Sequence, residues 1–429
     1  MDNNMEMNMQ EKERAFLIGV NLNNDTDFHK SMEELKSLAE ACEFEIAGQT
    51  EQNLKAANSA YYIGSGKVKE TAQLIDASEA DVVIFNNELT PSQLKNLERA
   101  FECRVIDRTS LILEIFARRA RTKEAKLQVE VARLQYMLPR LAGMSEALDR
   151  QGGGGTGTVV RGSGEKKIVL DRRRIEKSIA ALKRELELIE KDRQTQRKMR
   201  NESGLPKVAL VGYTNAGKST LMNALVELSG KSDSKKVFEK DMLFATLETS
   251  VRKIVLPDNK AFLLSDTVGF VSRLPHNLIK AFRSTLDEVR EADLLLNVID
   301  ASDPEAERQV AVTEDTLKVI GAEDIPVIYV YNKADLTDMK LPYIKGNKIY
   351  ISAKQRIGLN ELVELAGSYI FKTYVDCKML IPYDLGGIVS YFRENANVKD
   401  IRYEHNGTML MLECTEDDFR RYRKFAVDV

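Results

Sequence analysis

The segment from Gly212 to Ser219 has the residue types and the spacing of a loop that binds phosphate. It fits the pattern G-x-x-x-x-G-K-[ST], formed here by Gly212, Tyr213, Thr214, Asn215, Ala216, Gly217, Lys218 and Ser219. In such loops backbone N–H groups surround the phosphates, the lysine reaches the β- and γ-phosphates, and the final hydroxyl binds Mg²⁺. We therefore predict a nucleotide site here, with Lys218 as a catalytic residue and Ser219 as a metal ligand.

Apolar segments on both sides indicate the elements that hold this loop. Lys207–Val211 is typical of a buried strand, and Thr220–Leu225 is typical of an apolar helix. A helix N-terminus attracts phosphate, because its first N–H groups lack partners and its dipole is positive there. The context agrees with the motif.

A second strand followed by an acidic residue predicts the next part of the site. Asp266, Thr267, Val268 and Gly269 follow the apolar run Ala261–Leu264. A carboxylate at a strand end beside a phosphate loop is placed to hold the Mg²⁺ shell. Since Gly269 has no side chain, its N–H can approach a γ-phosphate, so we predict a catalytic role for it.

Two further loops predict which base is bound. Asn332, Lys333, Ala334 and Asp335 follow the apolar run Val327–Tyr331, and Ser352, Ala353 and Lys354 follow Lys348–Ile351. The Asp335 carboxylate can accept both N–H donors of the guanine edge, whereas adenine would leave it unpaired, a mismatch worth about 10⁴-fold in selectivity. GTP and GDP are therefore the predicted ligands, and an ATP-specific kinase or motor is the weakest alternative.

In this order, the motifs resemble those of the HflX family of translational GTPases over roughly residues 12 to 370. Other segments that carry the resemblance are Tyr62–Lys67, Asp107–Thr109, Leu111–Phe116, Glu124–Gln128, Leu138–Leu141, Arg161–Gly162, Gly164–Glu165, Asp171–Arg174, Phe244–Glu248 and Leu274–His276. The resemblance implies a Mg²⁺-dependent GTPase that binds the large ribosomal subunit and separates stalled ribosomes. It also implies that Phe244, Ala245, Thr246, Leu247 and Glu248 contact the nucleotide, with Thr246 as a metal ligand and a catalytic residue.

Phe270 occupies a position near which Ras-like enzymes have a glutamine that orients the attacking water. A phenyl ring neither donates nor accepts a hydrogen bond. Hydrolysis must therefore depend on Mg²⁺, Lys218, backbone dipoles and water positioning from elsewhere. We expect slow turnover by the protein alone and acceleration by the ribosome.

The region before the GTPase motifs predicts an α/β domain and two long helices. Apolar runs alternate with helical patterns over residues 13–120, which is typical of a parallel sheet. Gly64–Lys67 opens a helix there, and either a second site that takes ATP or a structural glycine turn is consistent with it. Residues 121–203 then show two heptad patterns, at 127–141 and 175–189, which predict an antiparallel hairpin with an arm of about 25 residues, or about 38 Å.

The linker of this hairpin is rich in glycine, with Gly152–Gly155, Gly157 and Arg161. Its two interpretations are a connector without a task and a thin probe that enters an RNA-lined space. Basic residues concentrate on the second helix, at Arg172–Arg174 and Lys183–Arg184, and favour an RNA partner.

The rest of the chain predicts the GTPase domain at 204–371 and a small α/β domain at 372–429, with a strand at 377–382, a helix at 387–395, a hairpin turning near Asn406–Gly407 and a final helix at 416–425. Residues 1–12 are polar, and we expect them to be disordered. The predicted fold class is therefore a multidomain α/β protein.

Composition sets the remaining limits. The formal charge of −3 argues against a general polyanion binder, and we expect no DNA partner. Four scattered cysteines and the lack of an 18-residue apolar run favour a cytoplasmic protein without a membrane span, with peripheral membrane contact left open. We expect a monomer. Two alternatives to ribosome splitting are a checkpoint in large-subunit assembly and a non-ribosomal regulator that nucleotide switches.

The variant Asp335→Asn tests the base assignment. An amide both donates and accepts, so it should favour xanthosine nucleotides, which carry a second carbonyl, over guanosine nucleotides. Competition binding of GDP and XDP to the purified variant measures this. An unchanged preference for GDP would contradict the role of Asp335.

Overall fold

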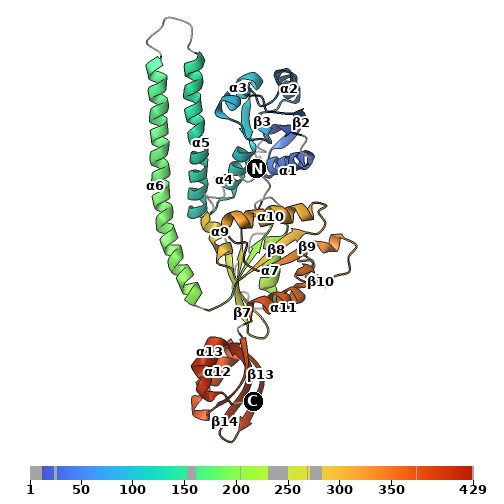
Figure 1. Cartoon of the computed structure of the whole chain (residues 1–429), viewed down its shortest axis with the longest axis vertical. Helices are drawn as coiled ribbons and strands as arrows, with labels where there is room; N and C mark the ends of the chain where they lie inside the picture. The colour runs from blue at the N-terminus through green and yellow to red at the C-terminus, as the bar shows by residue number, and fades with distance from the viewer. Residues whose placement is uncertain are drawn as a thin grey trace, which may run out of the picture. The chain divides into compact units, whose positions relative to one another are not determined.

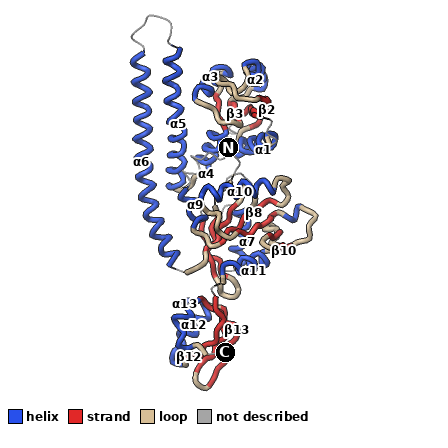
Figure 2. Tube along the Cα trace, in the orientation of Figure 1, coloured by secondary structure: helices blue, strands red, loops and turns tan. Residues whose placement is uncertain are grey.

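The computed structural model describes residues 12–23, 27–151, 161–202, 204–229, 250–267, 269–270, 283–372 and 374–427. The chain divides into two compact units, one consisting mainly of residues 1–193 and the other mainly of residues 194–429. The described strands form three sheets, of four, seven and three strands (Figures 1 and 2). The predicted α/β class is confirmed. The tail predicted to be disordered lies outside the described residues, except for Lys12.

The N-terminal sheet is parallel, with the strand order β2-β1-β3-β4. Its strands are β1 (Arg14–Leu22), β2 (Glu45–Leu54), β3 (Val82–Phe85) and β4 (Arg104–Asp107). Helices α1 (Phe28–Ala41), α2 (Ser65–Ser78), α3 (Pro91–Phe101) and α4 (Arg108–Arg119) connect or follow them. The sequence patterns did not indicate β2, because it is a polar edge strand in which most side chains are only half-buried.

Two long helices form the predicted antiparallel pair, and Figure 1 shows them side by side. These are α5 (Lys123–Gln151) and α6 (Arg161–Glu202), with 29 and 42 residues. Both exceed the predicted 25 residues, and α6 extends about 63 Å at about 1.5 Å per residue. Ile175, Ile179, Leu182, Leu186 and Ile189 are less exposed than the residues between them, which confirms the heptad stripe on α6. The glycine-rich segment 152–160 lies outside the described residues.

The buried carboxylate of Asp107 joins α5 to the N-terminal sheet. It caps α4 by accepting a hydrogen bond from Ser110 N at 2.9 Å, and it accepts another from Leu89 N at 3.2 Å. From α5, Arg140 Nη2 lies 2.7 Å from the same carboxylate and Tyr136 donates its hydroxyl to it. Burial raises the pKa of Tyr136 far above its usual range, so the phenol stays a donor.

The seven-stranded sheet carries the nucleotide motifs and has the order β10-β11-β9-β8-β5-β7-β6. Its strands are β5 (Lys207–Val211), β6 (Ser250–Val255), β7 (Ala261–Asp266), β8 (Leu294–Asp300), β9 (Val327–Asn332), β10 (Tyr343–Lys345) and β11 (Lys348–Tyr350). Strands β5, β7, β8, β9 and β11 are parallel, whereas β6 and β10 pair with their neighbours in the antiparallel direction. Its helices are α7 (Lys218–Leu228), α9 (Arg283–Arg290), α10 (Ala306–Ile320) and α11 (Leu359–Ile370).

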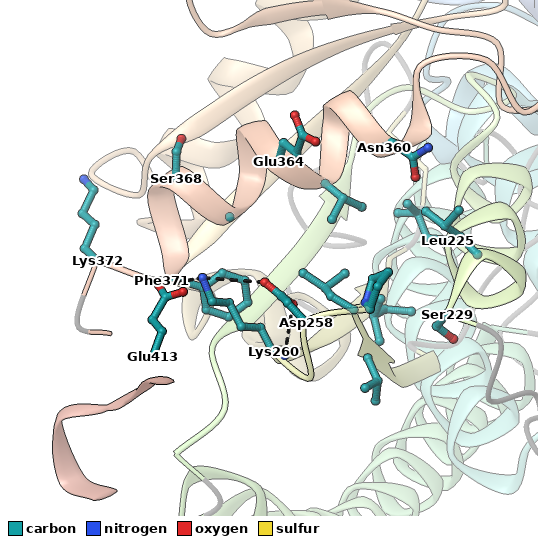
Figure 3. Close-up of a pocket in the computed structure, with 17 residues that line it drawn as sticks. Leu225, Ser229, Asp258, Lys260, Asn360, Glu364, Ser368, Phe371, Lys372 and Glu413 are labelled. Atoms are coloured by element: carbon teal, nitrogen blue, oxygen red, sulfur yellow. Dashed lines mark hydrogen bonds and ion pairs between the residues drawn. The ribbon is translucent and has the colours of Figure 1, made fainter. Parts of the chain in front are cut away.

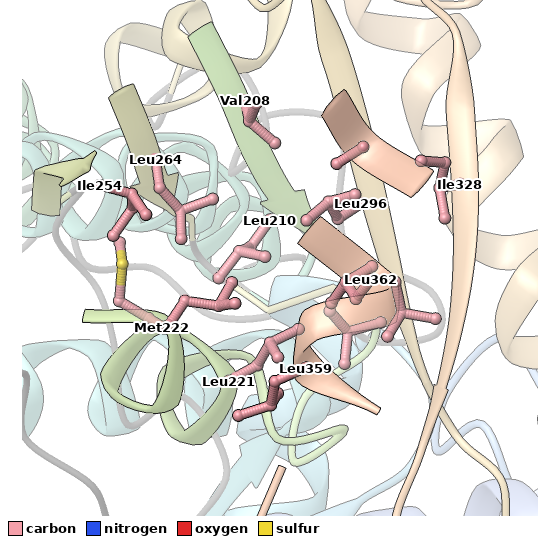
Figure 4. Packing of buried hydrophobic residues seen from close by; sticks show 14 of the residues in the cluster. Val208, Leu210, Leu221, Met222, Ile254, Leu264, Leu296, Ile328, Leu359 and Leu362 are labelled. Atoms are coloured by element: carbon pink, nitrogen blue, oxygen red, sulfur yellow. The ribbon is translucent and has the colours of Figure 1, made fainter. Parts of the chain in front are cut away.

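Alternate residues of the central strands build the core beside the phosphate loop. Val208 and Leu210 of β5 pack with Leu221 and Met222 of α7 and with Leu359 of α11 (Figure 4). Each side chain is no more than 3% exposed. This packing fixes the end of β5 and the start of α7, between which the loop lies.

The C-terminal domain is an antiparallel sheet of order β12-β14-β13 with its own core. It consists of β12 (Tyr374–Ile381), α12 (Gly386–Asn395), β13 (Asn397–Glu404), β14 (Gly407–Thr415) and α13 (Glu416–Tyr422). The predicted strand, helix, hairpin and final helix are all present. The final helix is shorter than predicted, because Arg423–Phe425 forms a 3₁₀ turn.

The Asp107 anchor predicts a large loss of stability for Arg140→Met. This change removes the cation from a carboxylate that has no solvent exposure, so we expect about 2–4 kcal/mol of destabilisation. Arg133→Met is the matched control on the same helix, because it removes an exposed pair with Glu130 and should cost under about 0.5 kcal/mol. Urea unfolding measures both values, and equal losses would contradict the anchor.

Candidate functional site

The phosphate loop joins β5 to α7 and closes tightly at Gly217. Its φ of +92° is in the left-handed region, and a Cβ there would lie 2.2 Å from Asn332 Nδ2. Asn332 donates through this amide to Ala216 O at 2.9 Å. The base-recognition loop therefore contacts the phosphate loop, and Gly217 must be glycine for both to fit.

Lys218 lies at the centre of the loop and is only 6% exposed. Its Nζ donates to the carbonyls of Gly212 at 2.9 Å and Tyr213 at 2.6 Å. Burial lowers the pKa of Lys218 to about 8, although the nearby Asp266 carboxylate partly opposes this shift. A cation held in this way favours an anionic ligand, as a phosphate group would be.

Two oxygen ligands of the kind that Mg²⁺ prefers meet beside this lysine. Ser219 Oγ donates to Asp266 Oδ2 at 2.8 Å, and Asp266 is completely buried at the end of β7. Thr267 is also buried and donates to Leu210 O at 2.6 Å, which holds the chain just after Asp266. A hydroxyl and a carboxylate at this distance fit a magnesium site.

The segment after β7 is hydrogen-bonded to the phosphate loop. Phe270 N donates to Gly212 O at 3.1 Å, and Thr214 N donates to Phe270 O at 2.8 Å. The Phe270 side chain is 2% exposed, so this residue packs in the protein and leaves water positioning to other groups. Gly269 lies against the loop, where a Cβ would be 2.8 Å from Thr214 Cγ2 and 3.1 Å from Lys218 Nζ.

The two predicted base loops also meet, again through Asn332. Ala353 N donates to Asn332 Oδ1 at 3.0 Å, so a single amide connects both base loops to the phosphate loop. Asp335 is half-buried and accepts a hydrogen bond from Gln355 Nε2 at 3.1 Å. Ser352 is buried and accepts from Gln355 N, whereas Lys354 is exposed.

Two supporting residues were not predicted from the sequence. Gln355 contacts Asp335, and Asp300 at the end of β8 forms an ion pair with Lys333 at 2.7 Å. Asp300 ends an apolar strand, which is the same signal that identified Asp266. Lys333 has a left-handed φ of 59°, and the Asp300 contact helps to hold it there.

The remaining predicted residues divide into two groups. Tyr213 is half-buried, Asn215 is exposed with φ of 62°, and Ala334 is buried within the predicted base loop. Phe244–Glu248, which include the predicted metal ligand Thr246, and Val268 lie outside the described residues. Their roles stay predictions.

The candidate ATP segment at the start of α2 has internal partners. Gly64 N donates to Gln52 Oε1 at 2.9 Å, and Lys67 Nζ pairs with Glu70 at 2.6 Å. These contacts fit a structural turn, and an ATP site there stays a prediction. Over the described ranges no cluster of three His, Cys, Asp or Glu side chains could hold a metal, and no described helix could span a membrane.

Comparison with known protein families identifies relatives of this chain. The profile described as "50S ribosome-binding GTPase" matches residues 207–333, "GTP-binding GTPase N-terminal" matches 29–117, and "GTP-binding GTPase Middle Region" matches 119–200. The GTPase HflX of Caldanaerobacter subterraneus subsp. tengcongensis is 44% identical over 423 residues, which are 99% of this chain and 96% of that protein. The chain belongs to the HflX family of GTPases. The Escherichia coli GTPase HflX is 37% identical over 419 residues, or 96% of each chain.

HflX membership confirms the resemblance seen in the motifs, and the protein is a GTPase with a guanine nucleotide domain. A solved structure of a GTP-binding protein from the hyperthermophilic archaeon Sulfolobus solfataricus, in complex with GDP, is also similar. It shares 26% sequence identity and covers 83% of this chain and 98% of its own, with a TM-score of 0.42.

Gly269→Ala tests the contact between the segment after β7 and the phosphate loop. The added methyl group would overlap Thr214 and crowd Lys218 Nζ, so we expect GTP turnover to fall by about 10²-fold. Gly66→Ala is the matched control, since its Cβ would have no neighbour within 4 Å. Phosphate release measures both variants. Normal turnover of Gly269→Ala would show that the described contact is not needed.

The lowered pKa of Lys218 predicts a pH dependence of nucleotide binding. Above about pH 8 the free protein carries a neutral amine, whereas a bound phosphate favours the ammonium form. Binding then takes up a proton, and the affinity for GDP falls as the pH rises through the pKa. We expect about a fourfold loss between about pH 7 and about pH 8.5. Calorimetry in buffers of different ionisation enthalpy measures the affinity and the proton uptake, and the absence of both effects would contradict the shift.

Proposed function

We propose that this HflX-family GTPase binds the large ribosomal subunit in its GTP-bound state and separates stalled ribosomes into subunits. The observation that carries the proposal is the long α5–α6 pair, which a glycine-rich segment joins in the sequence, in a chain with a guanine nucleotide site. A rigid pair of helices can carry a thin loop into a space too narrow for a folded domain.

The described surface of α6 supports an RNA partner. Arg173, Lys183 and Arg184 are exposed, whereas Arg172 and Arg174 pair with Glu176 and Asp171 on the same helix. Exposed cations along a helix can contact the phosphates of RNA, which releases the counterions bound to the RNA and favours association. The match to the family described as 50S ribosome-binding GTPase agrees with this direction.

In this proposal Ser219 and Thr246 would hold Mg²⁺, and Asp266 would support its shell. When bound, the metal neutralises charge on the β- and γ-phosphates. Lys218 contacts the same phosphates, Gly269 offers its N–H to the γ-phosphate, and Asp335 binds the guanine edge. Thr246 and Gly269 thereby couple the presence of the third phosphate to the segments on either side of β6 and β7.

The test replaces residues 152–161 with a short flexible linker in the full-length protein. We expect GDP and GTP to bind as before, and we expect joined ribosomes incubated with the variant and GTP to stay joined in a sucrose gradient. The unchanged protein should give separate subunits with GTP or a non-hydrolysable analogue and fewer with GDP. Gly269→Ala serves as the comparison, because it impairs the nucleotide site and leaves the loop intact.

A checkpoint in subunit assembly is the second candidate, since it uses the same large-subunit contact. It predicts cosedimentation with isolated large subunits and no separation of joined ribosomes under any nucleotide. Failure to cosediment with large subunits would overturn both ribosomal functions and favour the non-ribosomal regulator.

A further inference from the structure

The tip of the β6–β7 hairpin is held by the C-terminal domain. The tip turns at Asn259, whose φ is 62°, and Leu256 N donates to Lys260 O at 2.8 Å across it. Asn259 Nδ2 donates to the carbonyls of Arg393 at 3.0 Å and Ala396 at 3.3 Å, at the end of α12. The side chain of Asn259 thus caps a helix of another domain.

Lys260 adds a second contact to the same domain. Its Nζ lies 2.7 Å from Glu413 Oε1 on β14 and 3.7 Å from Asp258 Oδ2, with the side chain 14% exposed. The cation also lies 5.4 Å from the ring centroid of Phe371, which follows α11, and 5.3 Å from that of Tyr374, the first residue of β12. Asn397 Nδ2 donates to the other oxygen of Glu413 at 3.3 Å, so both residues orient the same carboxylate.

A cavity of about 680 Å³ lies beside these contacts. Leu225 of α7, Asn360 and Glu364 of α11, and Asp258 and Glu413 contribute to its lining (Figure 3). Figure 3 shows Lys260 between Asp258, Phe371 and Glu413 at one side of this space. The polar contacts of Asn259 and Lys260 therefore lie beside a space that side chains do not fill.

The other end of the same hairpin lies in the nucleotide site. Six residue pairs connect the strands, from Val255–Ala261 near the tip to Ser250–Asp266 at the base. Asp266 accepts the hydroxyl of Ser219 at 2.8 Å, about 20 Å along β7 from Lys260. A displacement of the tip can reach the base through these paired strands, of which β7 also pairs with β5.

We propose that the C-terminal domain positions Asp266 through this hairpin, with Asn259 and Lys260 as the positioning residues for GTP hydrolysis. The C-terminal sheet then sets how firmly the metal-side oxygens of Ser219 and Asp266 are held. The inference needs the GTPase activity and no ribosome, so its test is independent of the proposed ribosomal function.

The test uses Asn259→Gly, Lys260→Met and their combination in the full-length protein. Glycine keeps the left-handed backbone and removes the amide, and methionine keeps the length of lysine and removes its charge. We expect kcat for GTP to fall about fivefold in the combined variant with a smaller change in KM, and labelled GDP to dissociate about fivefold faster. Lys260→Arg, which keeps the cation, should have a kcat and a GDP dissociation rate close to those of the starting protein.

Lys399→Met is the control. It removes an exposed pair between Lys399 of β13 and Asp376 of β12, and neither residue contacts the β6–β7 hairpin. It should leave both rates unchanged. Glu413→Gln removes the negative charge that pairs with Lys260 and should reproduce part of the Lys260→Met effect. Rates within about twofold of the starting protein in the combined variant would overturn the proposal. So would a fall in activity that merely follows the unfolded fraction in urea.

Discussion

The side-chain amide of Asn332 is the contact on which the arrangement of the nucleotide loops depends. Its nitrogen donates to Ala216 O and its oxygen accepts from Ala353 N, so one planar group sets the spacing of three loops. Those loops follow β5, β9 and β11, whose carboxyl ends meet at one edge of a parallel sheet. Because the amide is 2% exposed, water does not compete for these hydrogen bonds.

The buried charge of Lys218 then favours an anionic ligand at this site. Lys218 has a lowered pKa because it is buried with two carbonyl oxygens and one nearby carboxylate as its compensation. Phosphate oxygens would pair with the buried cation. Binding would then remove the unfavourable free energy of burying an incompletely paired charge, which favours the bound state. A Cβ on Gly269 would lie 3.1 Å from Lys218 Nζ, so the segment after β7 borders the same space as the lysine.

The sequence was most informative where short patterns determine local geometry. Gly217, Lys218 and Ser219 form the loop as their spacing predicts, and Asp266 and Ser219 lie together although 47 positions separate them. The resemblance supplied Thr246, which no periodicity could have indicated. Strand β2 was missed because a polar edge strand lacks the apolar alternation that marks buried strands.

Contacts between distant segments were beyond such patterns. Arg140 contacts Asp107, which is 33 positions away in the sequence, and Lys260 contacts Glu413, which is 153 positions away. All four are charged residue types that are common on protein surfaces. Nothing local distinguishes these charges from the many others in the chain. Pairing of this kind follows from the assembled fold, which a single sequence does not show.

Phe270 has a consequence for how the protein is loaded. A buried phenyl ring near the place of a water-orienting glutamine can neither donate nor accept a hydrogen bond to the attacking water. When exchange is faster than hydrolysis, the nucleotide carried by the free protein reflects the ratio of GTP to GDP in its surroundings. Under that condition the share of the protein in its GTP-bound state falls as the ratio of GTP to GDP falls.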